Sequence, residues 1–338
     1  MVLHEFAVEP EEQTQLLAWL DGDHPEPVTP RGAATVLLLR HGPAGEGDVE
    51  IFLLRRRASM AFAPRMHAFP GGGVDPRDSD ADIPWAGPTP TEWAAQLHCP
   101  TPLAAALVCA AVREMFEECG VLLAGSSAGD VVADVSGDDW ERDRLALLDR
   151  SLALSELLVR RRLHLRSDLL RAWAHWTTPE FEPRRFDTWF FVAALPEGQH
   201  ARHIGGEADR AHWIGIDDLV SGYAAGDLPM YPPTITTVAD AVAAVRNRPS
   251  GLSGIEAVLA SPRQVRRVMP WLARTPDGAA VMQVDLDGRG GGRSGSDGPD
   301  SAAVLGLLPW RSRDRAARGS AAWPASGRTA CWRRTQAR

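Results

Sequence analysis

Arg113–Val121 reads REMFEECGV and decides how the rest of the chain is interpreted. The stretch ends a run rich in Ala, Leu, Val and Met that holds no internal Pro or Gly, which predicts a helix over Leu103–Cys119. Gly120 follows where a glycine that ends a helix belongs. The stretch contains three glutamates, Glu114, Glu117 and Glu118. Their spacing of three and four residues places them on one face of the helix.

This shared acidic face has two interpretations. Three carboxylates on one face suit a hard cation such as Mg²⁺ or Mn²⁺, which takes oxygen ligands. An acidic face in contact with water is the alternative, because such faces are common on helices. Like charges one turn apart repel by only about 0.2–0.5 kcal/mol on an exposed helix, so the helix by itself does not decide between the two.

A glycine-rich turn upstream of the helix favours the metal site. Phe69–Asp75 reads FPGGGVD, in which an apolar residue and a proline precede three consecutive glycines. Consecutive glycines allow positive φ angles and a close approach of the backbone to a ligand or an ion.

The glycine turn and the acidic helix together resemble the Nudix box of the Nudix hydrolase superfamily. That pattern is Gly, five residues, Glu, seven residues, then Arg-Glu-apolar-any-Glu-Glu-any-Gly-apolar. Arg113–Val121 matches every fixed position of its second half, and the first half matches from Gly72, with Asp78 in place of the usual Glu. Ser79–Val112 fills the space of the seven residues, so the box is split by an insertion. The chain thus resembles the split-box branch that includes the peroxisomal coenzyme A diphosphatase of animals.

The resemblance implies an α/β (α+β) fold of the Nudix type, an α/β/α sandwich around a mixed β-sheet with a helical insertion. The sequence agrees with the start of such a fold. Apolar runs at Ala33–Leu39 and Ile51–Leu54 flank a turn-rich loop and predict a β-hairpin ahead of the glycine turn. Arg184–Ala193 contains a strand by its aromatic and β-branched content, and Pro232–Arg246 predicts a helix with Pro in its first turn.

We divide the chain into three parts. They are an N-terminal helix and linker (1–30), a Nudix domain (31–275, with insertions at about 79–102 and 136–170) and a C-terminal tail (286–338). We expect the tail to be disordered, because residues 288–338 change abruptly to Gly, Ser, Arg and Trp with no clear periodicity. The leucine-rich stretch Asp139–Leu170 predicts one or two helices that pack on the sheet, or a dimer contact, so a homodimer remains open.

Composition and charge exclude several classes of function. Residues 1–287 carry 26 Arg against 41 acidic residues, a net charge of −15, which argues against a nucleic-acid partner. No apolar run approaches the ~20 residues of a membrane helix, and the N-terminus lacks the regions of a signal peptide. The four cysteines have neither metal-site spacing nor a disulfide pattern. We therefore expect a reduced, cytoplasmic protein that acts on a small molecule, with no membrane partner.

The resemblance assigns roles residue by residue. It implies that Mg²⁺ or Mn²⁺ is bound by Glu114, Glu117, Glu118 and the carbonyl of Gly71. The candidate catalytic residues are Glu114, Glu117, Arg113 and Glu207. Arg113 is implied to hold an acid of the box by a salt bridge, either a glutamate or Asp78. Glu207 precedes a predicted strand and is the candidate for the further acid that completes the metal site or acts as base, with Asp209 as the second choice.

The candidate substrate-binding residues are Arg55, Arg57, Arg65, Gly72 and Arg185. Arginine can meet phosphate oxygens through paired hydrogen bonds, although for any single arginine a solvated basic loop is the alternative. The resemblance implies hydrolysis of the pyrophosphate bond of a nucleoside diphosphate linked to another moiety, and we take coenzyme A or acyl-coenzyme A as that compound. The alternatives are ADP-ribose or a dinucleotide, or a non-catalytic Nudix-fold ligand-binding module. The intact acids of Arg113–Val121 argue against the module.

Overall fold

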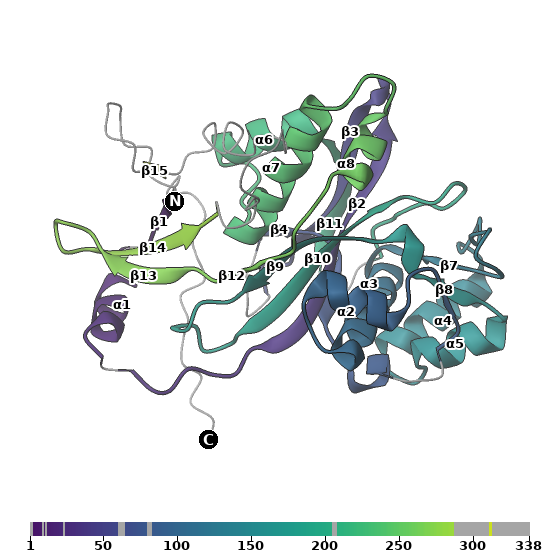
Figure 1. Cartoon of the computed structure of the whole chain (residues 1–338), viewed down its shortest axis with the longest axis horizontal. Coiled ribbons are helices and arrows are strands. Elements are labelled where there is room, and N and C mark those ends of the chain that lie inside the picture. Colours follow the sequence, from purple (N-terminus) through teal and green to yellow (C-terminus); the bar gives the residue numbers. More distant parts are fainter. Residues whose placement is uncertain are drawn as a thin grey trace.

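The computed structural model of the chain describes residues 3–8, 10, 12–22, 24–59, 65–79, 83–204, 208–286 and 311–312. A mixed eight-stranded sheet forms the centre of the fold, with helices on both of its faces (Figure 1). Its strands run in the order β11 (Ala208–Gly215), β3 (Gly45–Arg56), β2 (Arg31–Gly42), β10 (Phe186–Ala194), β9 (Arg171–Thr177) and β12 (Arg267–Val268). Two short strands, β4 (His67–Ala68) and β5 (Gly71–Gly73), pair with β3 and β2.

The sheet is mixed because two of its pairings are parallel. β10 runs parallel to β2, and β12 runs parallel to β9, whereas the other neighbouring strands are antiparallel. The predicted hairpin is confirmed as β2 and β3, which pair from Leu39 opposite Ile51.

Alternation of side chains along β2 and β3 supplies two separate cores. Val36, Leu38, Phe52 and Leu54 are buried on the face covered by α3 (Thr101–Cys119), with α2 (Pro90–Leu97) beside it. Leu37, Leu39, Ile51 and Leu53 are buried on the other face, with α6 (Ile216–Ala225), α7 (Pro232–Arg246) and α8 (Gly254–Ala260). The predicted α/β/α sandwich is therefore confirmed.

The predicted helix over Leu103–Cys119 is confirmed as α3, which begins two residues earlier, at Thr101. It ends as expected, because Gly120 adopts the left-handed conformation (φ 72°) and its N–H donates to the carbonyl of Phe116. None of the described helices is long and apolar enough to cross a membrane alone. Only α2 and α3 taken together meet the length and composition, and they are bent by 94°.

The two insertions contact each other. The 3₁₀ helix η1 (Pro76–Ser79) lies just before the first insertion, which contains β6 (Trp85–Ala86) and α2. The second insertion contains α4 (Asp138–Leu148), α5 (Leu154–Arg161), β8 (His164–Arg166) and the 3₁₀ helix η2 (Ser167–Leu169). β8 pairs with both β6 and β7 (Ala124–Gly125) in a small third sheet that the sequence did not predict. The leucine-rich stretch is thus two helices, followed by a strand.

A second sheet joins the two ends of the described chain. β1 (Leu3–Ala7) pairs with β14 (Ala280–Asp285) and with β15 (Arg311–Ser312), and β14 pairs with β13 (Trp271–Arg274). The N-terminal segment therefore holds a strand as well as the expected helix, which is α1 (Gln13–Leu20). Most of the predicted tail, 287–310 and 313–338, lies outside the described residues.

Candidate metal and active site

The glycine turn lies directly against the acidic face of α3. The N–H of Gly71 donates to Oε2 of Glu118 at 2.8 Å, and Nη2 of Arg113 donates to the carbonyl of Gly73 at 3.0 Å. β5 carries these glycines along β2, on the sheet that α3 covers. The fold therefore brings the two halves of the split box into contact across the insertion, as the sequence required.

Two of the glycines are needed because of how closely their neighbours approach. A Cβ atom on Gly72 would clash with Oε1 of Glu114. A Cβ atom on Gly71 would lie 2.5 Å from the carbonyl oxygen of Ala34 on the neighbouring strand. Any side chain at Gly72 would therefore push into the carboxylate that is predicted to bind metal.

Arg113 ties the acidic helix to η1. Its Nε and Nη2 donate to the two carboxylate oxygens of Asp78, each at 2.9 Å. Its Nη1 donates to Oε1 of Glu114 at 2.8 Å and to Oε1 of Glu117 at 3.3 Å. The partner that the sequence left open is thus mainly Asp78. Although Asp is one methylene shorter than Glu, it reaches Arg113 from η1, where its Oδ2 also accepts the N–H of Asp75.

Burial shapes the electrostatics of this cluster. Burial raises the pKa of Glu114 to about 7, against the opposing effect of Arg113. Burial also raises the pKa of Glu117, again opposed by Arg113. One guanidinium faces three carboxylates here, those of Asp78, Glu114 and Glu117. Burial thus disfavours the charged forms of these glutamates, and a bound divalent cation would favour them again.

The donors fit a hard divalent cation that is only partly held by protein. Glu114, Glu117 and Glu118 offer carboxylate oxygens, and Gly71 lies within hydrogen-bonding distance of Glu118. Across the described ranges, no three acidic, His or Cys side chains converge as in a preformed metal cage. Glu114, Glu117 and Glu118 are therefore not gathered as a closed set of ligands in this structure.

Three predicted substrate arginines lie where β3 meets β11 or in the turn after β3. Arg55 makes a paired interaction with Asp209, with Nε and Nη2 at 2.7 and 2.9 Å from its oxygens. Alternation along β3 puts Arg55 with Leu53, on the face opposite α3. Arg57 is exposed and donates to the carbonyl of Ala208. Arg65 is exposed, with its backbone in the left-handed region (φ 63°).

Of the remaining two candidates, the structure describes only Arg185. Arg185, at the start of β10, is buried and donates to the carbonyls of Val28 at 2.8 Å and Thr178 at 3.1 Å, contacts that favour a structural role. Glu207 lies outside the described residues.

Sequence reasoning missed three residues near these sites. Arg77 of η1 donates to the main-chain carbonyl of Arg150 in the turn after α4, and Arg144 of α4 donates to that of Glu117 on α3. His67 is buried on β4 with its Nδ1 lacking a hydrogen-bond partner, and its ring lies 5.7 Å from that of His212. A lone His or Arg in this chain carries no pattern that would have identified it.

Comparison with known proteins agrees with this geometry. The family model of the NUDT19 Nudix domain matches residues 86–240. The chain is 26% identical over 252 residues to the acyl-coenzyme A diphosphatase NUDT19 of Gallus gallus, covering 60% of this chain and 65% of that protein's length. It is 30% identical to the NUDIX hydrolase from Alicyclobacillus acidocaldarius, with a TM-score of 0.52 over 62% of this chain and 90% of that one. The fold brings the two halves of the box into contact, and the family model and both relatives are of the Nudix type. The chain therefore belongs to the Nudix hydrolase family.

Proposed function

We propose that the protein is a divalent-metal-dependent pyrophosphohydrolase that cleaves a nucleoside diphosphate linked to another moiety. The contact of Gly71–Gly73 with Arg113 and Glu118 carries the proposal, because it sets the acidic face of α3 beside a backbone that a ligand can approach. A pyrophosphate carries negative oxygens that repel an attacking hydroxide. Hydrolysis therefore needs positive charge at the phosphates, and the acidic face is suited to hold it as a cation.

We assign the roles as follows. Glu114, Glu117, Glu118 and the Gly71 carbonyl would hold Mg²⁺ or Mn²⁺, which when bound neutralises phosphate charge and lowers the pKa of a water ligand. We also keep Glu114 as the candidate that orients the attacking water or takes its proton. Arg113 fixes the orientation of Glu114 and Glu117.

Further contacts with the substrate are assigned by exposure. Arg57 and Arg65 are exposed and are the arginines that we propose to meet the phosphates. Gly72 would let the substrate approach the backbone. The guanidinium groups of Arg55 and Arg185 donate to Asp209 and to main-chain carbonyls, so we do not propose these two residues as phosphate contacts. Glu207 is kept as the candidate for a further catalytic acid.

We infer that the substrate is coenzyme A or acyl-coenzyme A. The likeness to a relative named as an acyl-coenzyme A diphosphatase supports this choice over ADP-ribose or a dinucleotide. The anchored Arg113 and the intact glutamates support an enzyme over a ligand-binding module of the same fold.

The test is a substrate panel on the full chain with Mg²⁺ or Mn²⁺. Release of 3′,5′-ADP from coenzyme A, detected by chromatography, is the expected result. Faster cleavage of ADP-ribose or a dinucleotide would change the substrate but keep the activity. Binding of these compounds with no cleavage in either metal would overturn the proposed enzyme.

A further inference from the structure

We propose that the inserted helices α4 and α5 position the acidic helix, through Arg144 of α4 and through Arg77 of η1. Arg144 lies outside the box, and Arg77 is one of its variable positions, directly before Asp78. α4 packs against α3, and α5 packs against η1, which carries Asp78. The inference rests on the proposed metal site and concerns how its carboxylates are kept available.

Arg144 acts on the main chain of α3. It is 3% exposed, and its Nη1 donates to the carbonyl of Glu117 at 2.9 Å. Carbonyls in the last turn of a helix have no partner within the helix, so this bond satisfies a group that would otherwise be unpaired. Glu141, also on α4, holds the guanidinium in place through two hydrogen bonds of 3.0 and 2.6 Å. Arg144 thus fixes the backbone of a proposed metal ligand.

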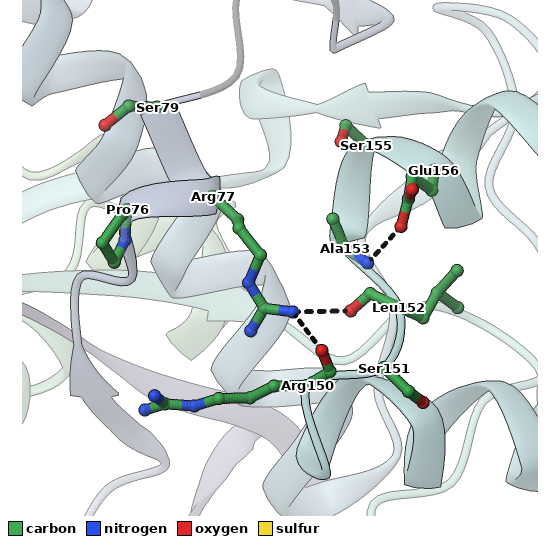
Figure 2. Close-up of a pocket in the computed structure, with 9 residues that line it drawn as sticks. All are labelled: Pro76, Arg77, Ser79, Arg150, Ser151, Leu152, Ala153, Ser155 and Glu156. Carbon is green, nitrogen blue, oxygen red and sulfur yellow. Dashed lines mark hydrogen bonds between the residues drawn. The ribbon is translucent and has the colours of Figure 1, made fainter.

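Arg77 connects η1 to the turn between α4 and α5 (Figure 2). On one side its Nε and Nη2 donate to Asp75 at 2.9 and 3.1 Å. On the other side its Nη1 donates to the carbonyls of Arg150 at 2.8 Å and Leu152 at 3.3 Å. Asp75 in turn donates its N–H to Asp78 at 2.8 Å. The inserted turn is therefore linked through Arg77 and Asp75 to the acid that holds Arg113.

Arg77 lies beside a pocket that separates η1 from the inserted helices. An open pocket of about 430 Å³ lies between η1 and the inserted helices, and Arg77 lines it (Figure 2). Arg150 adds only a longer contact with Asp75, at 3.7 Å, from a side chain that is 77% exposed. Because apolar packing does not fill this gap, the hydrogen bonds of Arg77 connect its two sides.

A shift of η1 would change how many hydrogen bonds Arg113 makes to the carboxylate oxygens of Glu114 and Glu117. With Asp78 in place, Nε and one N–H of Nη2 of Arg113 are taken, and Nη1 alone reaches Glu114 and Glu117. If η1 shifts, Arg113 loses Asp78 and turns more donors toward the glutamates. It then competes with the cation for the same oxygens. Arg77 is therefore a positioning residue for metal binding.

The experiment measures Mn²⁺ binding to the full chain without substrate, by electron paramagnetic resonance of the free ion. Arg77→Met should bind Mn²⁺ about tenfold more weakly than wild type. Asp78→Asn should weaken binding similarly, and the double variant no further, because residues that act through one another are not additive. Arg160→Met is the matched control, since Arg160 pairs with Asp143 inside the insertion, and it should bind as wild type does.

Circular dichroism and thermal unfolding check that each variant is folded. If Arg77→Met does not fold, Arg77→Gln carries the same test, because it lacks the ion pair with Asp75. Wild-type Mn²⁺ affinity in the Arg77 variant, or additive losses in the double variant, would overturn the inference. Glu117→Gln separates this failure from that of the proposed function. If Glu117→Gln keeps full Mn²⁺ affinity, the metal site itself is wrong; if it loses affinity while Arg77→Met does not, only the role of Arg77 is wrong.

Discussion

Two arginine–aspartate pairs on opposite faces of the sheet have nearly the same geometry and different environments. Arg113 and Asp78 meet through two hydrogen bonds of 2.9 Å, and Arg55 and Asp209 through two of 2.7 and 2.9 Å. The side chains of the first pair are 9% and 2% exposed, those of the second 31% and 32%. The number and length of hydrogen bonds therefore do not separate a structural anchor from a surface contact, whereas burial does.

The largest effect is expected from breaking the buried pair. Asp78→Ala leaves Arg113 buried beside Glu114 and Glu117 without its main partner. Removal of one member of a buried ion pair costs about 3–5 kcal/mol, so the free energy of unfolding should fall by that amount in urea titrations. A loss below about 1 kcal/mol would mean that Asp78 behaves like a surface acid.

The second-largest effect is expected in catalysis, at Glu117 on the face of the sheet that α3 covers. Glu117→Gln removes a charge that the proposed cation requires, and kcat/KM for pyrophosphate cleavage should fall by about 10²–10³, or about 3–4 kcal/mol. The fold should persist, because Arg113 keeps Asp78 and Glu114. The matched acid on the opposite face is Asp209, and Asp209→Asn should leave kcat/KM within about twofold, which is a small change on this scale. Equal losses in both variants would contradict the assignment of the active face.

A third effect comes from the buried histidine beside Arg55 and Asp209. Burial, the largest cause, lowers the pKa of His67 to about 4, and the nearby His212 acts in the same direction. Below pH 6.5 the unfolded chain takes up a proton on this His, while the folded protein does so only near pH 4. Stability should therefore fall as pH drops from 6.5 to 4, by on the order of 2–3 kcal/mol from His67. Well above pH 6.5, where the unfolded chain is also deprotonated, this residue contributes no pH dependence.

Urea titrations across this pH range compare wild type with His67→Gln. The raised pKa values of Glu114 and Glu182 act with the opposite sign between pH 4.5 and about 7, in the same window, so the difference between the two proteins is needed to isolate His67. The variant should show a flatter dependence between pH 6.5 and 4. Parallel curves would show that His67 titrates as an exposed histidine does.

The smallest effect is expected at the exposed pair. Arg55→Met should lower the free energy of unfolding by about 0.2–1 kcal/mol, the range of surface ion pairs. KM for the nucleotide substrate should stay unchanged, because the guanidinium of Arg55 is hydrogen-bonded to Asp209 and lies on the face of the sheet opposite α3. Initial-rate kinetics that show a several-fold rise in KM with intact stability would restore Arg55 as a substrate contact.

Much of the fold and the centre of the site could be predicted from local sequence. The hairpin of β2 and β3, the helix that ends at Gly120 and the helix from Pro232 each follow from a pattern of a few residues. The pairing of β1 with β14 could not, because its partners are far apart in the chain and five residues do not specify a register over that distance.

The supporting residues of the site were also beyond sequence reasoning, for a chemical reason. All 36 basic residues of the chain are Arg, so the presence of an Arg rather than a Lys carries no information. Arg77 and Arg144 also bond to main-chain carbonyls of Leu152 and Glu117, and a carbonyl acceptor leaves no trace in residue type. Only the three-dimensional arrangement identifies them.

The split of the box has a consequence for how the protein folds. The hydrogen bond from Arg113 to Gly73 joins residues 40 positions apart. Helix formation is local and fast, whereas contacts between distant segments wait for the loop between them to close. The residues of α3 can therefore become helical before the glycine turn reaches them. The glutamates and the glycine turn can meet only once the 40 positions between Gly73 and Arg113 have folded back, so we expect the site to be completed after α3 itself has formed.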